Sequence, residues 1–242
     1  MLQGKKVVVT GGASGIGLGI ALRMAEYGAS GARGGRRQEA IDTALSQFPS
    51  KHPGIGRTLN VARRDDVDLY FQWATEKLGQ IDILVQAAGI NIRDRSIKAM
   101  KPEEWDEVLA INATGAYNCL HAVLPQMLAR RDGLIVNISS VAGKRAIALG
   151  GVAYGASKFA MTALGTCVSN EVAEDGIRIT NVYPGEVNTT ILDKRPVPVS
   201  DEHRAKILQP EDVADIVLAI AMLPPRAHVP EIVIKPTTQI WF

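Results

Sequence analysis

Tyr154 and Lys158, four residues apart, are the pair of side chains in this sequence best suited to proton chemistry. On a helix, residues at positions i and i+4 project from the same face, so the two side chains would be neighbours. An ammonium beside a phenol stabilises the phenolate and lowers the tyrosine pKa from about 10 toward neutrality. Such a tyrosine can give or take the proton of a carbonyl–alcohol pair near neutral pH. The alternative is an ordinary Tyr and Lys on a helix surface.

A glycine-rich segment, residues 10–17 (Thr-Gly-Gly-Ala-Ser-Gly-Ile-Gly), offers a second chemistry, the binding of phosphate. It follows a β-branched run at residues 6–10 and precedes a predicted helix, where backbone N–H groups and the helix dipole can hold a pyrophosphate. We expect Gly11 to permit the tight turn, Gly15 to let phosphate approach, and Gly17 to let helix and strand pack closely. The spacing is G-x-x-x-G-x-G rather than G-x-G-x-x-G, and the alternative is a glycine-rich turn without a ligand.

The residues after the second predicted strand bear on which dinucleotide would bind. An acidic residue at the end of that strand would hold the adenosine ribose of NAD, whereas an arginine accommodates the 2′-phosphate of NADP. Here those positions are Gly34 and Gly35, followed by Arg36 and Arg37. Arginine forks bind phosphate well. We therefore expect NADP(H) to be preferred, with NAD(H) as the alternative, unless the two arginines are only a solvated helix face.

The elements that would position these groups alternate between strands and helices. Apolar or β-branched runs predict strands at residues 6–10, 57–61, 82–86, 133–139, 177–182 and 231–235. Helices are predicted over residues 15–27, 37–47, 65–78, 102–130, 154–175 and 211–223. Strands that alternate with helices form βαβ units, so the expected fold is α/β, with a parallel sheet and helices on both faces.

Two segments fit this alternation poorly. Residues 30–35 (Ser-Gly-Ala-Arg-Gly-Gly) lack the side chains that a central parallel strand normally packs. Only the rhythm of the neighbouring units predicts a strand there, and its regularity is left open. Residues 188–209, which include Pro196 and Pro198, form the longest irregular stretch. We expect that stretch to be a mobile lid.

Length and composition limit the class of protein. A chain of 242 residues fits one compact domain, residues 1–242, and 27 Lys and Arg against 25 Asp and Glu argue against a nucleic-acid-binding surface. No apolar run reaches membrane-spanning length, and a strand predicted from Lys6 leaves no room for a signal peptide. Cys119 and Cys167 have neither C-x-x-C spacing nor a nearby histidine cluster, which is typical of reduced packing residues. We expect a cytoplasmic protein that binds no metal, nucleic acid or membrane.

Several motifs in a fixed order resemble those of the short-chain dehydrogenase/reductase family. They are the loop at residues 10–17, Asn112-Ala113-Thr114-Gly115, Ser139-Ser140, Tyr154-x-x-x-Lys158 and Pro184-Gly185. The resemblance covers nearly the whole chain. It implies a Rossmann-type, doubly wound sheet of seven parallel strands and the nicotinamide-dependent interconversion of a carbonyl compound and its alcohol. In that reaction a hydride passes directly to carbon, so one positioned proton source is sufficient.

The resemblance also implies a catalytic tetrad of Asn112, Ser140, Tyr154 and Lys158. Tyr154 would be the acid/base, and Ser140 would hydrogen-bond the substrate oxygen. Lys158 would bind the nicotinamide ribose and lower the pKa of Tyr154, while Asn112 would hold a water that links Lys158 to solvent. Because the spacing from Ser140 to Tyr154 is one residue longer than expected for the family, Ser139 remains a rival for the serine role.

Carried over residue by residue, the resemblance implies a wider cofactor site. Asn60 and Val61 would contact adenine, and Val187 and Thr189 would contact the nicotinamide carboxamide. Where the family has Asn-Asn-Ala-Gly after the fourth strand, this chain has Gln86-Ala87-Ala88-Gly89, so Ala87 would contribute only its backbone. The full predicted set of cofactor contacts is Gly11, Ser14, Gly15, Ile16, Gly17, Arg36, Arg37, Asn60, Val61, Ala87, Gly89, Tyr154, Lys158, Pro184, Gly185, Val187 and Thr189.

The substrate is predicted only as a class. Many family members that reduce acyl-carrier-protein thioesters end in a Gly-Gly-rich segment, whereas residues 231–242 resemble the branch acting on small hydroxy acids, serine-type alcohols and varied carbonyls. We expect a small carbonyl or alcohol substrate. The alternatives are a 3-oxoacyl thioester reductase and, outside enzymes, a catalytically silent NADP(H)-binding redox sensor, against which the intact tetrad argues.

Oligomerisation is also implied by the resemblance. The family implies a homo-oligomer, a tetramer or a dimer, formed through the long helices after Pro102 and after Tyr154. The apolar tail Ile240-Trp241-Phe242 would suit such an interface.

Overall fold

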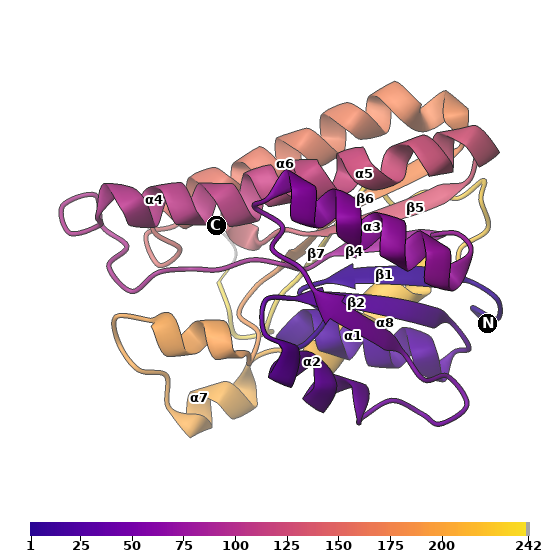
Figure 1. The fold of residues 1–242 in the computed structure, drawn as a ribbon. Coiled ribbons are helices and arrows are strands. Elements are labelled where there is room, and N and C mark those ends of the chain that lie inside the picture. Colours follow the sequence, from indigo (N-terminus) through magenta and orange to yellow (C-terminus); the bar gives the residue numbers. More distant parts are fainter. Residues whose placement is uncertain (241–242) are drawn as a thin grey trace.

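Seven strands form one parallel sheet in the computed structural model, which describes residues 1–240 (Figure 1). The strand order is β3-β2-β1-β4-β5-β6-β7. The order runs outward in opposite directions from β1 and β4, so the carboxyl ends of these two strands mark the point where ligands bind in open α/β sheets. The predicted doubly wound, seven-stranded α/β fold is confirmed. The strands are β1 (Lys6–Thr10), β2 (Ser30–Gly35), β3 (Ile55–Thr58), β4 (Ile83–Gln86), β5 (Gly133–Ile138), β6 (Ile177–Pro184) and β7 (Glu231–Ile234).

Helices cover both faces of the sheet. Figure 1 shows α1, α2 and α8 on one side and α3, α5 and α6 on the other. Successive residues of β1 point to opposite faces, so Val9 packs into the core beneath α1 and α8, while Val8 packs into the core beneath α3 and α5. The helices are α1 (Gly15–Glu26), α2 (Gln38–Leu45), α3 (Arg64–Leu78), α4 (Pro102–Leu109), α5 (Gly115–Arg130), α6 (Val152–Val172), α7 (Asp201–Lys206) and α8 (Pro210–Ala221).

The long helix predicted over residues 102–130 is interrupted by a π-helical turn. This turn, η1 (Ala110–Thr114), separates α4 from α5. The prediction of one continuous α-helix was wrong, because a single wider turn barely disturbs the apolar periodicity from which helices are predicted. The turn leaves Asn112 fully buried, and π-turns of this kind often occur at functional sites.

The glycine-rich segment at residues 30–35 is a regular strand, paired in parallel with β1 and β3. A Cβ on Gly34 would overlap the side chain of Leu59, so the missing side chain makes room for a neighbour. Arg33 is only 2% exposed, and its guanidinium carbon lies 3.2 Å from the centre of the Phe48 ring. Burial lowers the pKa of Arg33 to about 10. The alternation of elements therefore predicted the strand correctly, and packing of Arg33 on Phe48 replaces the usual apolar contacts.

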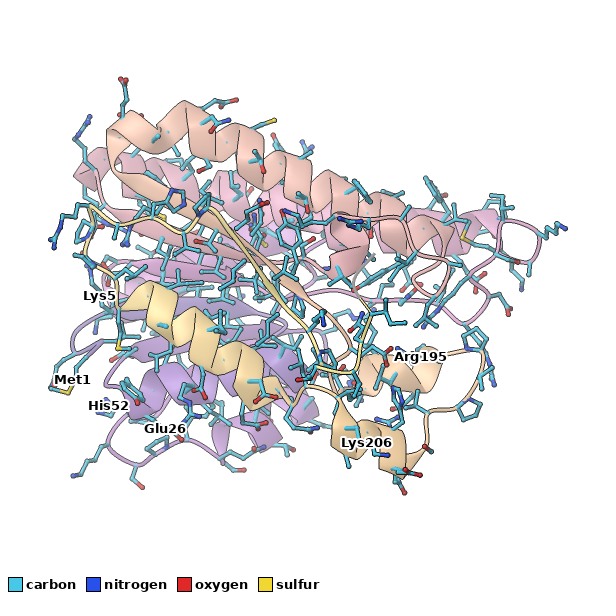
Figure 2. The ribbon with its side chains drawn as sticks, turned by 180° about the vertical axis from the view of Figure 1, so that it is seen from behind. Met1, Lys5, Glu26, His52, Arg195 and Lys206 are labelled. Carbon is cyan, nitrogen blue, oxygen red and sulfur yellow. The ribbon has the colours of Figure 1, made fainter. Side chains whose placement is uncertain are left out.

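The segment predicted to be irregular, residues 188–209, contains two short helical elements. They are the 3-10 helix η4 (Thr190–Lys194) and α7. Figure 2 shows Arg195 and Lys206, which belong to this segment, at the opposite end of the molecule from Met1 and Lys5. The other predicted elements are all present, and their ends differ by a few residues.

Several surface properties follow from the residues described. Among residues 1–240, no helix is both long and apolar enough to cross a membrane, and no group of three or more His, Cys, Asp or Glu side chains could hold a metal ion. Both cysteines are free, but Cys167 is exposed, so the prediction that it is a packing residue was wrong. Ile240 is 70% exposed, and Trp241 and Phe242 of the predicted interface tail lie outside the described residues.

Candidate active site

A cavity of about 260 Å³ opens where β1, β4, β5 and β6 end. Parallel strands bring their carboxyl ends to one edge of the sheet, so residues far apart in the chain meet there. The predicted site residues that line this cavity are Gly11, Ser14, Gly15, Ile16, Gly17, Ala87, Gly89, Ser139, Ser140, Tyr154, Lys158, Pro184, Gly185, Val187 and Thr189. The predicted residues outside its lining are Arg36, Arg37, Asn60, Val61 and Asn112.

The turn after β1 has the shape of a phosphate cradle. Gly11 has a φ of 68°, and a Cβ there would lie 2.7 Å from the Ala88 backbone nitrogen. A Cβ on Gly17 would overlap the carbonyl oxygen of Gly11. Within residues 1–240, the Ser14 side chain makes no capping hydrogen bond and the first turn of α1 holds no acid, so the first N–H groups of α1 can receive an anion. These residues fit the pyrophosphate of a dinucleotide.

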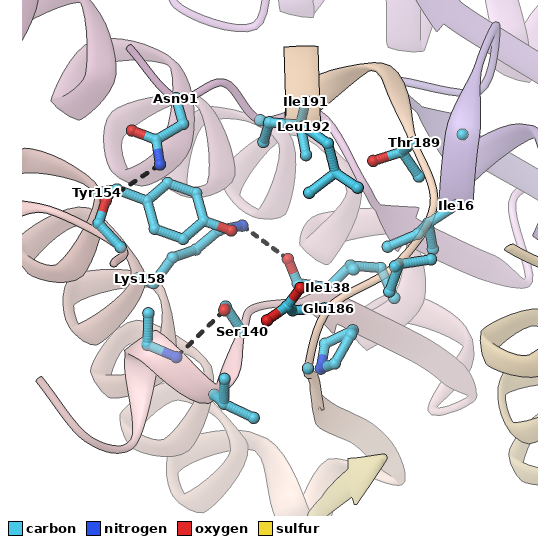
Figure 3. Close-up of a pocket in the computed structure, with 18 of the residues that line it drawn as sticks. Ile16, Asn91, Ile138, Ser140, Tyr154, Lys158, Glu186, Thr189, Ile191 and Leu192 are labelled. Carbon is cyan, nitrogen blue, oxygen red and sulfur yellow. Dashed lines mark hydrogen bonds between the residues drawn. The ribbon is translucent and has the colours of Figure 1, made fainter. Parts of the chain in front are cut away.

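Tyr154 and Lys158 lie in the first two turns of α6 and face the cavity together (Figure 3). The Lys158 Nζ lies 5.7 Å from the centre of the Tyr154 ring and donates a hydrogen bond to the Ile138 carbonyl oxygen at 2.8 Å. Burial disfavours the ammonium and lowers the pKa of Lys158 to about 8. The structure therefore brings the predicted pair together and leaves the lysine able to exchange its proton near neutral pH.

The pKa of Tyr154 is raised, whereas the sequence predicted that it would be lowered. Burial is the main cause because it disfavours the phenolate; hydrogen bonding to Ser140 and the charge of Arg95 partly oppose it. The prediction was wrong because Lys158 directs its ammonium to the Ile138 carbonyl, an orientation that the four-residue spacing does not determine. In this arrangement Tyr154 is a protonated hydrogen-bond donor at the cavity wall.

The two serines after β5 have different surroundings. Ser139 is 4% exposed; its hydroxyl donates to the Lys158 carbonyl oxygen at 3.2 Å and lies 3.1 Å from Thr162 Oγ1. The Ser140 Oγ accepts the Ala142 N–H at 3.1 Å, and Ser140 also hydrogen-bonds Tyr154. Ser140 is therefore better placed than Ser139 to share a substrate oxygen with Tyr154.

Asn112 braces the backbone that follows β4. Its Oδ1 accepts the Ile90 N–H at 2.8 Å, and its Nδ2 donates to the Ile90 carbonyl at 2.9 Å and to Ser157 Oγ at 3.0 Å. A Cβ on Gly89 would lie 3.4 Å from the Asn112 Oδ1 and 3.5 Å from the Lys158 Nζ. Asn112 thus lies behind the cavity wall. Because Gly89 has no side chain, a space remains between Asn112 and Lys158.

A buried row of amides crosses β4, β5 and β6, and the sequence reasoning missed it. Gln86 Nε2 donates to Asn137 Oδ1 at 3.1 Å, and Asn137 Nδ2 donates to Asn181 Oδ1 at 3.0 Å. These three residues are register partners on adjacent strands. The Asn181 amide continues the row to α6, where a Cβ on Gly165 would overlap both asparagine side chains. The amide row therefore ties the helix that carries Tyr154 to the centre of the sheet.

The predicted adenosine contacts lie partly at a second cavity. Arg36 and Asn60 line this cavity of about 280 Å³ together with Arg57. The Arg36 guanidinium lies 3.7 Å from the Glu107 carboxylate, and both side chains are more than half exposed. Arg37 and Val61 do not line this cavity, since Arg37 is exposed at the start of α2 and Val61 is buried in the core.

Among the residues that line the main cavity and were not predicted are Asn91, Thr190 and four that carry its charges or contact them. Arg95 follows β4, Glu186 follows β6, Arg195 follows η4, and Gln239 follows β7. The Gln239 Oε1 accepts the Glu186 N–H at 3.0 Å, and an Arg195 terminal nitrogen lies 3.1 Å from a Glu186 carboxylate oxygen. Their spacing in the chain carries no signal, because Glu186 and Gln239 are distant in sequence and the nine residues from Glu186 to Arg195 match no helix or strand period.

Comparison with known proteins assigns this architecture to a family. The short chain dehydrogenase family model matches residues 5–197. The 3-oxoacyl-[acyl-carrier-protein] reductase of Thermotoga maritima is 34% identical over 229 residues, which are 91% of this chain and 91% of that protein. The chain belongs to the short-chain dehydrogenase family, and it is an oxidoreductase.

Solved structures agree with this assignment. An alcohol dehydrogenase from the archaeon Thermococcus sibiricus, complexed with 5-hydroxy-NADP, has a TM-score of 0.88 at 25% identity and covers 98% of this chain and 99% of its own. The closed form of a serine dehydrogenase complexed with NADP+ has a TM-score of 0.87 at 27% identity, with coverage of 98% and 96%. The similarity therefore extends over nearly all of both chains.

Proposed function

We propose that this protein is an NADP(H)-dependent oxidoreductase that interconverts a small carbonyl compound and its alcohol, with Tyr154 as the acid/base. One observation carries the proposal: Tyr154, Ser140 and Lys158 line the same cavity as the glycine-rich turn at residues 11–17, which fits a pyrophosphate. Bound NADPH would supply a hydride to the carbonyl carbon. The chain then has to orient the carbonyl and provide one proton.

The roles of the side chains follow from their surroundings. Tyr154 keeps its proton because burial raises its pKa, and it donates that proton to the substrate oxygen as negative charge develops there. Ser140 hydrogen-bonds the same oxygen and orients it. Lys158, whose pKa is about 8, holds the nicotinamide ribose and returns a proton to Tyr154. Asn112, across the space beside Gly89, would position the water that connects Lys158 to solvent.

Turnover by wild type and by a tyrosine variant tests this function. NADPH and NADH oxidation should be followed in parallel with small ketones, aldehydes, β-keto esters and a 3-oxoacyl thioester. We expect turnover with NADPH and a subset of these compounds, and a loss of about 100- to 10,000-fold in Tyr154→Phe with NADPH binding retained. Tyr117→Phe, on the exposed side of α5, is the matched control. Unchanged turnover in Tyr154→Phe would refute the assignment of the proton donor.

NADP(H), rather than NAD(H), is the cofactor that we propose. β2 ends in Gly34 and Gly35, with no carboxylate to hold a ribose, and Arg36 lines the second cavity with Arg57. Three similar structures hold an NADP-type dinucleotide, which supports this choice, while a fourth holds NADH and keeps NAD(H) as the alternative. The 2′-phosphate would replace Glu107 as the partner of Arg36.

Calorimetric titration of NADPH and NADH into an Arg36→Asp variant tests the cofactor preference. A carboxylate at this position would repel the 2′-phosphate, so NADPH binding should weaken far more than NADH binding. Arg226→Asp, an equal change of charge on the exposed loop before β7, is the control and should alter neither affinity. Equal losses for both dinucleotides in Arg36→Asp would show that Arg36 does not read the phosphate.

Reduction of a 3-oxoacyl thioester is the second candidate function, favoured by the 34% identity to the Thermotoga maritima reductase. A higher kcat/KM for the thioester than for every small carbonyl compound would select it. Tight NADPH binding without turnover of any compound would instead favour the redox sensor.

We also propose that the enzyme is a cytoplasmic homo-oligomer, a tetramer or a dimer, and that residues 188–209 act as a lid over the substrate. Ile191 and Leu192 of this segment line the cavity, which supports the lid. A monomeric mass by light scattering at micromolar concentration would contradict the oligomer.

A further inference from the structure

We propose that the cavity selects carbonyl compounds that carry a carboxylate, and that Arg95 binds this carboxylate beside Tyr154. The substrate class is then short aliphatic oxo acids and the matching hydroxy acids. This inference rests on the proposed function and narrows it. Neither hydride transfer nor binding of the pyrophosphate requires a positively charged side chain at position 95.

The charges of the cavity wall are unbalanced. The charged side chains that line it within residues 1–240 are Arg95, Lys158, Arg195 and Glu186. Glu186 pairs with Arg195 at 3.1 Å, and these two side chains are only 18% and 14% exposed. Lys158 is engaged with the Ile138 carbonyl and is assigned to the nicotinamide ribose. The cation that remains for an anionic substrate is Arg95.

Arg95 is held in place by neutral acceptors and keeps free donors. Its Nε donates to the Ile92 carbonyl at 2.9 Å, and its two terminal nitrogens donate to the Leu149 carbonyl at 2.7 Å and the Lys194 carbonyl at 3.2 Å. Guanidinium has five N–H groups, so one on each terminal nitrogen is left without a partner among the described residues. No Asp or Glu among residues 1–240 pairs with Arg95. Carboxylate is the group that arginine forks recognise best.

Arg95 and Tyr154 line the same cavity of about 260 Å³, so one small molecule can contact both side chains. Its positive charge lowers the pKa of Tyr154, against the larger effect of burial. Burial, followed by the charge of Arg195, lowers the pKa of Arg95 itself. A partly buried cation without a counter-ion is unfavourable, and a carboxylate entering the cavity would relieve this.

The rest of the wall suits a short hydrocarbon chain. The apolar side chains that line the cavity on the substrate side are Val141, Ile147, Leu149, Ile191 and Leu192. Figure 3 shows Ile191 and Leu192 across the cavity from Tyr154 and Ser140. An oxo acid would place its carbonyl oxygen at Tyr154 and Ser140, its carboxylate at Arg95, and a few carbons against the apolar wall.

The rival interpretation is that Arg95 only ties together the loops at residues 92, 149 and 194. Varying the substrate on the wild-type enzyme separates the two. The probes are acetoacetate, methyl acetoacetate and acetoacetamide, which share a ketone and differ in the charge of the end group. We expect kcat/KM for the acid to exceed that for the ester and the amide by about 10- to 100-fold, chiefly through KM, as for a hydrogen bond to a charged group. Added salt should weaken the preference for the acid and leave the ester unaffected.

Variants then assign the effect to one side chain. Arg95→Gln should lose about 10- to 100-fold more in kcat/KM for acetoacetate than for the ester, and Arg95→Lys should restore part of this difference. Arg93→Gln removes the same charge from an exposed position on the same loop and should change neither substrate. Equal kcat/KM for acid and ester in wild type, or equal losses on both in Arg95→Gln, would overturn the proposal.

A binding measurement keeps this inference separate from the proposed function. Butyrate, which has no carbonyl to reduce, should bind the NADPH-loaded wild type in calorimetry and should bind Arg95→Gln at least about 10-fold more weakly. If butyrate binds in this way but no carbonyl compound turns over, the carboxylate site stands and the proposed function fails. If the ester turns over as well as the acid and butyrate does not bind, the function stands and the carboxylate site is refuted.

Discussion

Asn137→Ala should destabilise the protein strongly, because Asn137 is the middle member of the amide row that crosses three strands. The change leaves the Gln86 Nε2 and the Asn181 Oδ1 without their partners, and both residues are 2% exposed. An unsatisfied buried polar group costs about 1–3 kcal/mol, so the free energy of unfolding should fall by about 2–6 kcal/mol. The small cavity left by the amide adds to this loss.

Urea unfolding at one fixed protein concentration, followed by circular dichroism, measures this change. Gln38→Ala is the matched control: it removes an amide whose single hydrogen bond, 2.8 Å to Asp42, is exposed. We expect the control to change the free energy of unfolding by less than about 0.5 kcal/mol. The double variant Gln86→Ala/Asn137→Ala should lose less than the sum of the single losses, since the Gln86 donor that Asn137→Ala orphans is then absent.

Two outcomes would refute the reasoning. A loss below about 1 kcal/mol in Asn137→Ala would show that the orphaned groups find other partners. Strict additivity in the double variant would show that Gln86 and Asn137 do not act through their shared hydrogen bond.

Two further predictions concern Lys158 and the glycines near the cavity. The pKa of Lys158, about 8, lies below its ordinary value of 10.5, so the unfolded chain binds more protons between these values and stability rises with pH across that window. Urea unfolding from pH 7.5 to 10.5 should show the free energy of unfolding of the wild type rising by an amount on the order of 3 kcal/mol. The Lys158→Met variant should lack this rise. Identical pH profiles for the two proteins would contradict the prediction. Gly17→Ala should weaken NADPH binding in calorimetry and lower stability, because its Cβ would overlap the Gly11 carbonyl oxygen. Gly155→Ala is the control, because a Cβ there meets nothing within 4 Å. It should raise the free energy of unfolding by about 0.5–1 kcal/mol. If Gly17→Ala also raised the free energy of unfolding, the steric argument would be refuted.

Features that depend on short stretches of chain were determined by the sequence alone. The alternation of apolar runs with helical segments predicted the parallel sheet, because strand and helix periodicities are local properties. The same holds for the tight turn at residues 11–17 and for Tyr154 and Lys158 on one helix face, since both depend on spacing over a few residues. Even β2 was predicted from the rhythm of its neighbours, although its own residues argued against it.

Only the tertiary structure decided how these parts act on one another. The raised pKa of Tyr154 and the lowered pKa of Lys158 come from burial, which is set by segments distant in the chain. The amide row through Asn137 and the contacts of Arg95 likewise join distant loops and strands. The π-turn that buries Asn112 could not be predicted, because it changes the apolar periodicity of the sequence too little. Burial and charge are properties of the folded surroundings rather than of a residue's neighbours in sequence. The sequence therefore determined local pairs such as Tyr154 and Lys158, and the fold determined their protonation and which distant groups they meet.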